Sequence, residues 1–152
     1  MGPSVRCVSL PASIAVLTLT IVVLHRLMNR PSLNFTVIIN PSSGPGSSPF
    51  PDEQYTAALA QLATYPNARK VGYVRTGYAT RNLSDVISEL NVYAGWASKN
   101  QAFAIDGIFF DESPHQYTQD AVDFMLSATR AVKAANFQGL KTVCIGPINL
   151  AC

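Results

Sequence analysis

The sequence predicts an α/β protein built around a parallel sheet, and two observations carry that prediction. Runs of β-branched or aromatic residues recur about 35 residues apart, and the segments between them have the periodicity of helices. Strand and helix that alternate at constant spacing are typical of successive βαβ units with right-handed crossovers.

Four strands are expected, at Phe35–Asn40, Lys70–Arg75, Ala104–Phe110 and Lys141–Ile145. Three helices lie between them. The first follows Asp52 and Glu53 and places Tyr55, Ala58, Leu59 and Leu62 on one face; the second has Asn82 or Ser84 as its cap and places Leu83, Val86, Ile87, Leu90, Tyr93 and Trp96 on one face. The third is predicted to begin at Ser113-Pro114, a capping residue followed by a first-turn proline.

The sheet is expected to be part of a (β/α)₈ TIM-type barrel. An open nucleotide-binding sheet is disfavoured, because the prolines of the loop Asn40–Gly46 remove backbone donors that would hold phosphate. A complete barrel needs roughly 200–250 residues. Residues 31–152 have room for about three to four βα units at the observed spacing, which predicts a partial barrel.

Residues 1–30 have the composition of an export leader. Arg6, Arg26 and Arg30 are their only charged residues, and Val8–Leu24 carries no charge at all. We expect a signal peptide or an uncleaved signal anchor, which would allow membrane anchoring. The alternative is a buried strand or helix of the fold, since the stretch is rich in β-branched residues. Sequons at Asn34 and Asn82, predicted glycosylation sites, fit an exported protein.

Composition excludes several partners and cofactors. The formal charge is +2, only 13% of the residues are charged and no basic run occurs, so nucleic-acid binding is not expected. Cys7, Cys144 and Cys152 form neither a disulfide framework nor a metal-ligand pattern, and no cofactor or structural metal is predicted.

The strongest chemical signal is the pair Asp111-Glu112, which directly follows an apolar strand. Carboxyl ends of parallel strands carry the ligand sites of α/β folds, and a carboxyl beside apolar residues suits acid–base or nucleophilic catalysis. The alternative places both acids in the first turn of the third helix, where its dipole favours them. A metal site at this pair is a weaker alternative, because partner ligands are lacking. Asp106, six residues before Glu112, would lie roughly 20 Å away and is excluded as the second acid.

Other residues at the predicted edge are candidates for substrate binding. Asn40 follows the first strand, Tyr78 and Arg81 follow the second, and His115 follows the third. Tyr78 and Arg81 suit stacking on, or hydrogen bonding to, a sugar; His115 is weighed against a solvated first-turn histidine. Tyr73 and Trp96 are interpreted as packing residues.

Several ordered motifs resemble one family. They are VIINPSSGPG at Val37–Gly46, GYVRTGYATR at Gly72–Arg81, Tyr93 with Trp96, and IDGIFFDE at Ile105–Glu112. Together, over residues 33–138, they are similar to the spherulation-specific family of spherulin-4-like cell-surface proteins. The resemblance implies a (β/α)₈ barrel and glycoside hydrolase activity on galactosamine-containing polysaccharide, of the endo-α-1,4-galactosaminidase type. It also implies catalytic roles for Asp111 and Glu112, with a further essential glutamate on a later strand.

Two departures from the family pattern qualify the predicted activity. The leader stands where the family has its first strand, and the chain stops soon after Lys141–Ile145, before the later glutamate. We therefore expect a chain truncated at both ends. The predicted function is a polysaccharide hydrolase, secreted or at the cell surface, and the alternative is a non-catalytic carbohydrate-binding protein.

Overall fold

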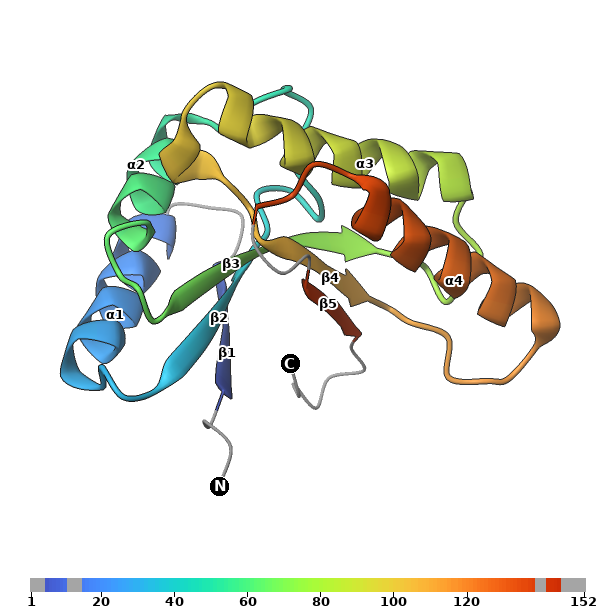
Figure 1. Ribbon diagram of the computed structural model, residues 1–152, viewed down its shortest axis with the longest axis horizontal. Helices are drawn as coiled ribbons and strands as arrows, with labels where there is room; N and C mark the ends of the chain where they lie inside the picture. The colour runs from blue at the N-terminus through green and yellow to red at the C-terminus, as the bar shows by residue number, and fades with distance from the viewer. Residues whose placement is uncertain (1–4, 11–14, 139–141, 146–152) are drawn as a thin grey trace.

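The predicted α/β class is confirmed by a parallel sheet in which the strands lie in the order of the sequence, β1-β2-β3-β4-β5 (Figure 1). This computed structural model describes the backbone of residues 5–10, 15–138 and 142–145, and the side chains of residues 22–138. The strands are β1 (Val5–Leu10), β2 (Asn34–Ile39), β3 (Ala68–Arg75), β4 (Gly107–Asp111) and β5 (Thr142–Ile145).

The register of the sheet brings the strand ends together at one edge. Ile39 of β2 pairs with Gly72 of β3, and Arg75 of β3 pairs with Asp111 of β4. Because all pairings are parallel, the loops that follow β2, β3 and β4 leave the sheet in the same direction.

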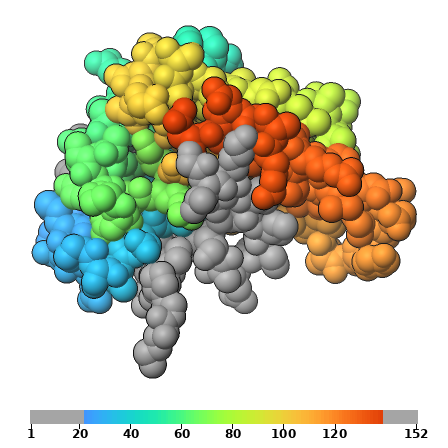
Figure 2. Space-filling model, in the orientation of Figure 1, coloured from blue at the N-terminus to red at the C-terminus, as the bar shows by residue number. Residues whose placement is uncertain are grey.

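The helices are α1 (Ala15–Asn29), α2 (Glu53–Leu62), α3 (Leu83–Gly95) and α4 (Gln119–Ala134), with short 3₁₀ turns at Trp96–Ser98 and Gln101–Phe103. They cover one face of the sheet, and α3 and α4 lie side by side on it (Figure 1, Figure 2). The main core lies between this face and the helices. On the opposite face Ile38, Val71 and Phe109 form a separate small cluster, against which Tyr73 packs.

Residues 15–29, expected to belong to an export leader, form the helix of the first βα unit in this structure. Val23 and Leu27 of α1 are each only 1% exposed and belong to the main core. Preceding α1, β1 pairs in parallel with β2. This is the arrangement that the alternative weighed from the sequence describes, and the export leader over residues 1–30 stays a prediction. Within the described ranges, no helix combines the length and the hydropathy that a membrane crossing requires.

Two of the three predicted helices begin where the sequence indicates. Asp52 caps α2 by accepting a hydrogen bond from the Tyr55 N–H at 2.9 Å. Asn82 caps α3 in the same way, through the N–H of Ser84.

The predicted start of the third helix at Ser113-Pro114 is wrong. The helix α4 begins at Gln119, and Thr118 is its cap. Ser113 is instead buried, and its hydroxyl donates to the Phe110 carbonyl. Glu112 just before it has a φ of +50°, which turns the chain away from helical geometry. Residues 112–118 therefore form a loop along the edge of the sheet.

Candidate functional site

Asp111 and Glu112 are not in a helix, so the helix-dipole explanation for them does not hold. Asp111 is the last residue of β4, and Glu112 opens the loop that follows. Strand alternation places Asp111 on the same face as Phe109, away from the helices. This is the geometry expected of a functional acid at the carboxyl edge of a parallel sheet.

The carboxylate of Asp111 is fixed by two donors. The Tyr73 hydroxyl donates to Oδ2 at 2.7 Å, and the backbone N–H of Glu112 donates to Oδ1 at 2.8 Å. Each oxygen thus accepts a hydrogen bond, and the two donors together favour one orientation of the carboxylate.

The backbone at Asp111 and Glu112 is locked to the end of β3 by Thr76. The Thr76 N–H donates to the Asp111 carbonyl at 2.9 Å, and its fully buried hydroxyl lies 2.7 Å from the Glu112 carbonyl. The Tyr78 N–H donates to the same Glu112 carbonyl at 2.6 Å. These bonds hold Glu112 in its left-handed conformation, which otherwise costs roughly 1–3 kcal/mol.

The Glu112 side chain lies beside a cation. Its Oε2 lies 3.7 Å from Nε of Arg75, and both side chains are partly exposed. An exposed pair of this kind contributes little stability, but it places a cation beside the second carboxylate.

Tyr78 and His115 come together above this edge. Gly77, Tyr78 and Ala79 all have positive φ, in a turn that presents the Tyr78 ring to solvent, where 55% of the residue is exposed. The rings of Tyr78 and His115 meet edge to face, with centroids 5.8 Å apart. The structure therefore brings two of the predicted sugar-binding residues into contact beside Glu112.

Asn40 lies at the same edge, one residue after Ile39, the register partner of Gly72. Its Oδ1 accepts a hydrogen bond from the Gly44 N–H at 3.2 Å, and its carbonyl accepts one from the Tyr55 hydroxyl at 2.9 Å. Asn40 therefore orders the loop after β2.

Arg81 holds the β3–α3 loop. Its guanidinium donates twice to the Glu89 carboxylate, at 2.6 and 3.1 Å, and once to the Arg75 carbonyl at 2.6 Å. The hydrogen bonds that Arg81 donates to Glu89 are the main cause that raises the pKa of Arg81. Because the Arg81 guanidinium is engaged in these hydrogen bonds, it acts on the site by holding the β3–α3 loop in place.

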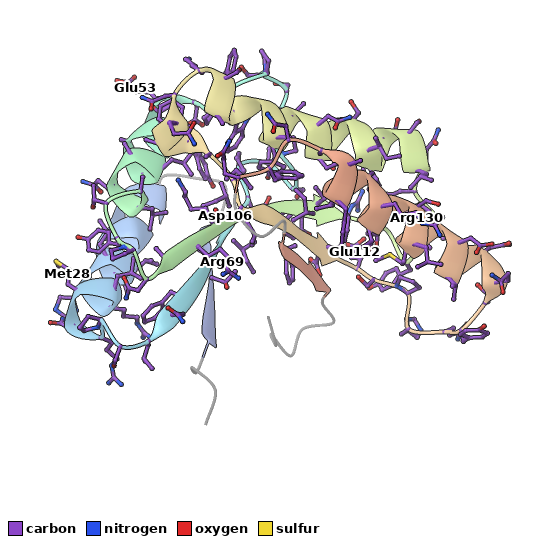
Figure 3. The ribbon with its side chains drawn as sticks, in the orientation of Figure 1. Met28, Glu53, Arg69, Asp106, Glu112 and Arg130 are labelled. Carbon is purple, nitrogen blue, oxygen red and sulfur yellow. The ribbon has the colours of Figure 1, made fainter. Side chains whose placement is uncertain are left out.

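The two sequon asparagines and the excluded acid lie elsewhere. Asn34 is exposed at the start of β2, and Asn82 is exposed at the cap of α3. Asp106 accepts a hydrogen bond from the Lys70 N–H at 2.8 Å, at the amino end of β4 (Figure 3). The prediction that Asp106 is too far to pair with Glu112 is therefore confirmed by its position at the other end of the strand.

One hollow, of about 450 Å³, lies between α4 and the loop that carries His115 and Tyr117. Another, of about 470 Å³, lies at the amino edge of the sheet, among Asn34, Thr36, Asn67, Arg69 and Asp106. Within the described part of the chain, no cluster of three or more His, Cys, Asp or Glu side chains is arranged to hold a metal ion.

The interpretation of Tyr73 as a packing residue missed its contact with Asp111. Its ring does pack beside Phe109, with centroids 6.2 Å apart, but its hydroxyl reaches the carboxylate. The available signal was its parity, because Tyr73 lies two residues before Arg75 on the same face of a strand that ends at the site.

The fold is a parallel α/β sheet with helices over one face, and comparison with known proteins gives the family. The model of spherulation-specific family 4 matches residues 22–149. The chain belongs to spherulation-specific family 4, as the motifs indicate.

Two relatives define the likeness further. Over 84 residues the chain is 37% identical to Spherulin-4 of Physarum polycephalum, an overlap of 55% of this chain and 23% of that protein. It is also similar to Aspergillus clavatus Sph3, whose crystal structure is in complex with GalNAc, with a TM-score of 0.82 and 37% identity over 95% of this chain and 58% of that one. The chain thus spans less than two thirds of the length of either relative.

Proposed function

We propose that this chain carries the sugar-binding and carboxylate part of a glycoside hydrolase site, for endo-acting cleavage of galactosamine-containing polysaccharide of the α-1,4 type. The observation that carries the proposal is the Asp111 carboxylate, held by two donors at the carboxyl edge of the sheet. The likeness to Sph3, which was crystallised with GalNAc, supports a hexosamine as the sugar.

A carboxylate at this place suits a reaction whose transition state is positively charged. Cleavage of a glycosidic bond passes through an oxocarbenium-like transition state, and a fixed carboxylate stabilises that charge or attacks the anomeric carbon. We assign this role to Asp111. Glu112 lies next to it and adds a second negative charge, which suits the protonated amine of galactosamine. The further glutamate implied by the family would supply acid–base catalysis from a later strand.

The remaining predicted residues are assigned to the substrate or to its supporting loops. Tyr78, with His115 at its edge, offers an exposed aromatic surface on which the apolar face of a sugar ring stacks. Asn40 lies across the same edge and presents an amide to sugar hydroxyls. Arg81 acts indirectly, since its donors hold the loop that carries Tyr78.

We also propose that the sheet is part of a closed (β/α)₈ barrel. Strands in sequential order, with helices α1–α4 on one face, support a barrel over a doubly wound sheet, in which the order reverses. On this proposal the cluster of Ile38, Val71 and Phe109 belongs to the barrel interior.

For the location of the protein we propose the cell surface or the exterior of the cell. The exposed sequons at Asn34 and Asn82 and the family support this proposal, and the export leader over residues 1–30 stays a prediction. Glycan analysis of the secreted protein, with Asn34→Gln and Asn82→Gln as variants, tests it.

The hydrolase proposal is tested by measuring new reducing ends from α-1,4-galactosamine polymer. In a protein that also carries the later glutamate, we expect release of reducing ends, and Asp111→Asn should lose at least about a hundredfold in rate, because the negative charge that stabilises the transition state is gone. Asp123→Asn, a loss of one exposed acid on α4, is the matched control and should keep the rate. Equal rates for Asp111→Asn and the wild type would remove Asp111 from its role.

A second candidate function is carbohydrate binding without hydrolysis. It is favoured by the share of Sph3 that the chain matches, which is 58% of that chain. Calorimetric binding of a galactosamine oligomer without any release of reducing ends, by a chain whose unfolding is cooperative, would select this function over the first.

A further inference from the structure

Tyr73 occupies a place that packing alone does not explain. It lies in β3 between Val71 and Arg75 on the face opposite the helices, and its ring packs beside Phe109. A phenylalanine would make that same ring contact. The hydroxyl adds a hydrogen bond to Oδ2 of Asp111 at 2.7 Å.

The phenol acts as a permanent proton donor. Burial and then the hydrogen bond to Asp111 raise the pKa of Tyr73 above its ordinary value of 10.0. It therefore stays protonated throughout the neutral range and serves neither as a base nor as a nucleophile there.

Charged side chains also lie near the Asp111 carboxylate, beside the hydroxyl of Tyr73. Among the described residues, Arg75 on β3 and Glu112 on the following loop share the electrostatic surroundings of Tyr73 and Asp111. The Nε atom of Arg75 lies 3.7 Å from Oε2 of Glu112, so the positive charge of Arg75 stands beside the Glu112 carboxylate. The fixed donors to the Asp111 carboxylate are then the Glu112 N–H and the Tyr73 hydroxyl.

We propose that Tyr73 is a positioning residue, which holds the Asp111 carboxylate in one rotamer by donating its phenolic proton to Oδ2. The inference rests on the proposed function, in which Asp111 faces the anomeric carbon. One oxygen is held by the backbone and the other by Tyr73, so the carboxylate cannot rotate without breaking a charge-assisted hydrogen bond.

The test compares Tyr73→Phe with Tyr93→Phe in the full 152-residue chain. Tyr73→Phe keeps the ring and removes the donor. Tyr93→Phe removes a buried hydroxyl that donates to the Ile39 carbonyl at 2.9 Å on the helical side of the sheet, and so controls for a lost hydroxyl as such. Thermal unfolding of both variants checks that they are folded.

The first readout needs no catalysis. With aspartate labelled at its carboxyl carbon, the Asp111 carboxyl resonance at neutral pH, followed by nuclear magnetic resonance, should shift in Tyr73→Phe, because one of its two donors is gone, and stay in place in Tyr93→Phe. An Asp111 resonance that is equal in Tyr73→Phe and the wild type would overturn the inference.

The second readout is hydrolysis of galactosamine polymer. In the protein used for the hydrolysis test, we expect kcat to fall about tenfold to a hundredfold in Tyr73→Phe with KM within about twofold. A rise in KM at unchanged kcat would make Tyr73 a substrate ligand instead. If the wild type releases no sugar, the proposed hydrolysis fails, and the Asp111 carboxyl resonance still decides the role of Tyr73.

Discussion

At Gly72 the lack of a side chain allows the Tyr93 ring to lie directly against β3. A Cβ built at this position would stand 2.6 Å from the ring. Tyr93 is fully buried there, and its hydroxyl donates to the Ile39 carbonyl. The glycine of the GYV motif therefore serves the contact between α3 and the strand ends that carry the site.

Gly72→Ala should lower the free energy of unfolding by about 1–3 kcal/mol, because a rigid ring and a backbone must move apart. Gly95→Ala is the matched control. Nothing lies within 4 Å of a Cβ at Gly95, which ends α3, so that change should be neutral or add up to about 1 kcal/mol. Urea unfolding measures both, and equal stabilities for the two variants would contradict the packing argument.

Sequence patterns predict such residues unevenly. The motif positions of Asp111, Glu112 and Tyr78 were identified from their place after apolar strands, which is a local signal. The bond from Tyr73 to Asp111 could not be predicted, because it joins residues 38 positions apart and depends on the register of β3 with β4. The alternation of side chains tells which face of the sheet a strand residue lies on. Only the register between two strands tells which residue of the next strand lies beside it.

At the scale of elements, the first βα unit differs most from the expectation. An uncharged apolar run is common to export leaders and to buried helices, so composition could not separate them. In this structure the segment has the spacing of a helix with one buried face. Val23 and Leu27 are four residues apart and both face the core, whereas Met28 is 56% exposed. The start of α4 was missed for a related reason, since Ser113 and Thr118 are both good caps and the chain turns at Glu112 first.

Leu27→Ala should cost about 2–5 kcal/mol of folding free energy if α1 is part of the domain core, as the structure has it. Met28→Ala, its exposed neighbour, should change the stability by less than about 0.5 kcal/mol. Chemical denaturation of the chain checks the pair. A Leu27→Ala variant as stable as the wild type would mean that residues 15–29 contribute nothing to the fold.

At the scale of the whole molecule, two buried tyrosines link the helices to the strand ends. Tyr55 from α2 donates to the Asn40 carbonyl and Tyr93 from α3 to the Ile39 carbonyl, while the partly buried Tyr73 of β3 donates to Asp111. Burial is the largest cause that raises the pKa of all three phenols. These phenols therefore link stability to alkaline pH.

The free energy of unfolding should fall as the pH rises above about 10. Unfolded tyrosines lose their protons near their ordinary pKa of 10.0, while the folded ones keep theirs, so the folded state binds more protons in that range. Below that range the contribution is fully present. In Tyr93→Phe the decline should be shallower by up to about 1.4 kcal/mol per pH unit.

Urea unfolding at pH 8 and between pH 10 and 11 measures the two slopes. Lys70 acts in the opposite direction, because burial lowers its pKa and stability then rises with pH up to its ordinary value of 10.5. The difference between the variant and the wild type cancels this contribution. Identical slopes would contradict the role given to the buried phenols.

The central claim is that a galactosamine chain binds at the carboxyl edge of the sheet, around Asp111. The most direct measurement maps backbone amide shifts of Asp111→Asn, which should leave the sugar intact, on addition of a galactosamine oligomer. We predict shifts at Thr76–Tyr78 and Glu112–His115. Shifts confined to the hollow at the amino edge, at Asn34, Asn67, Arg69 and Asp106, would contradict the claim.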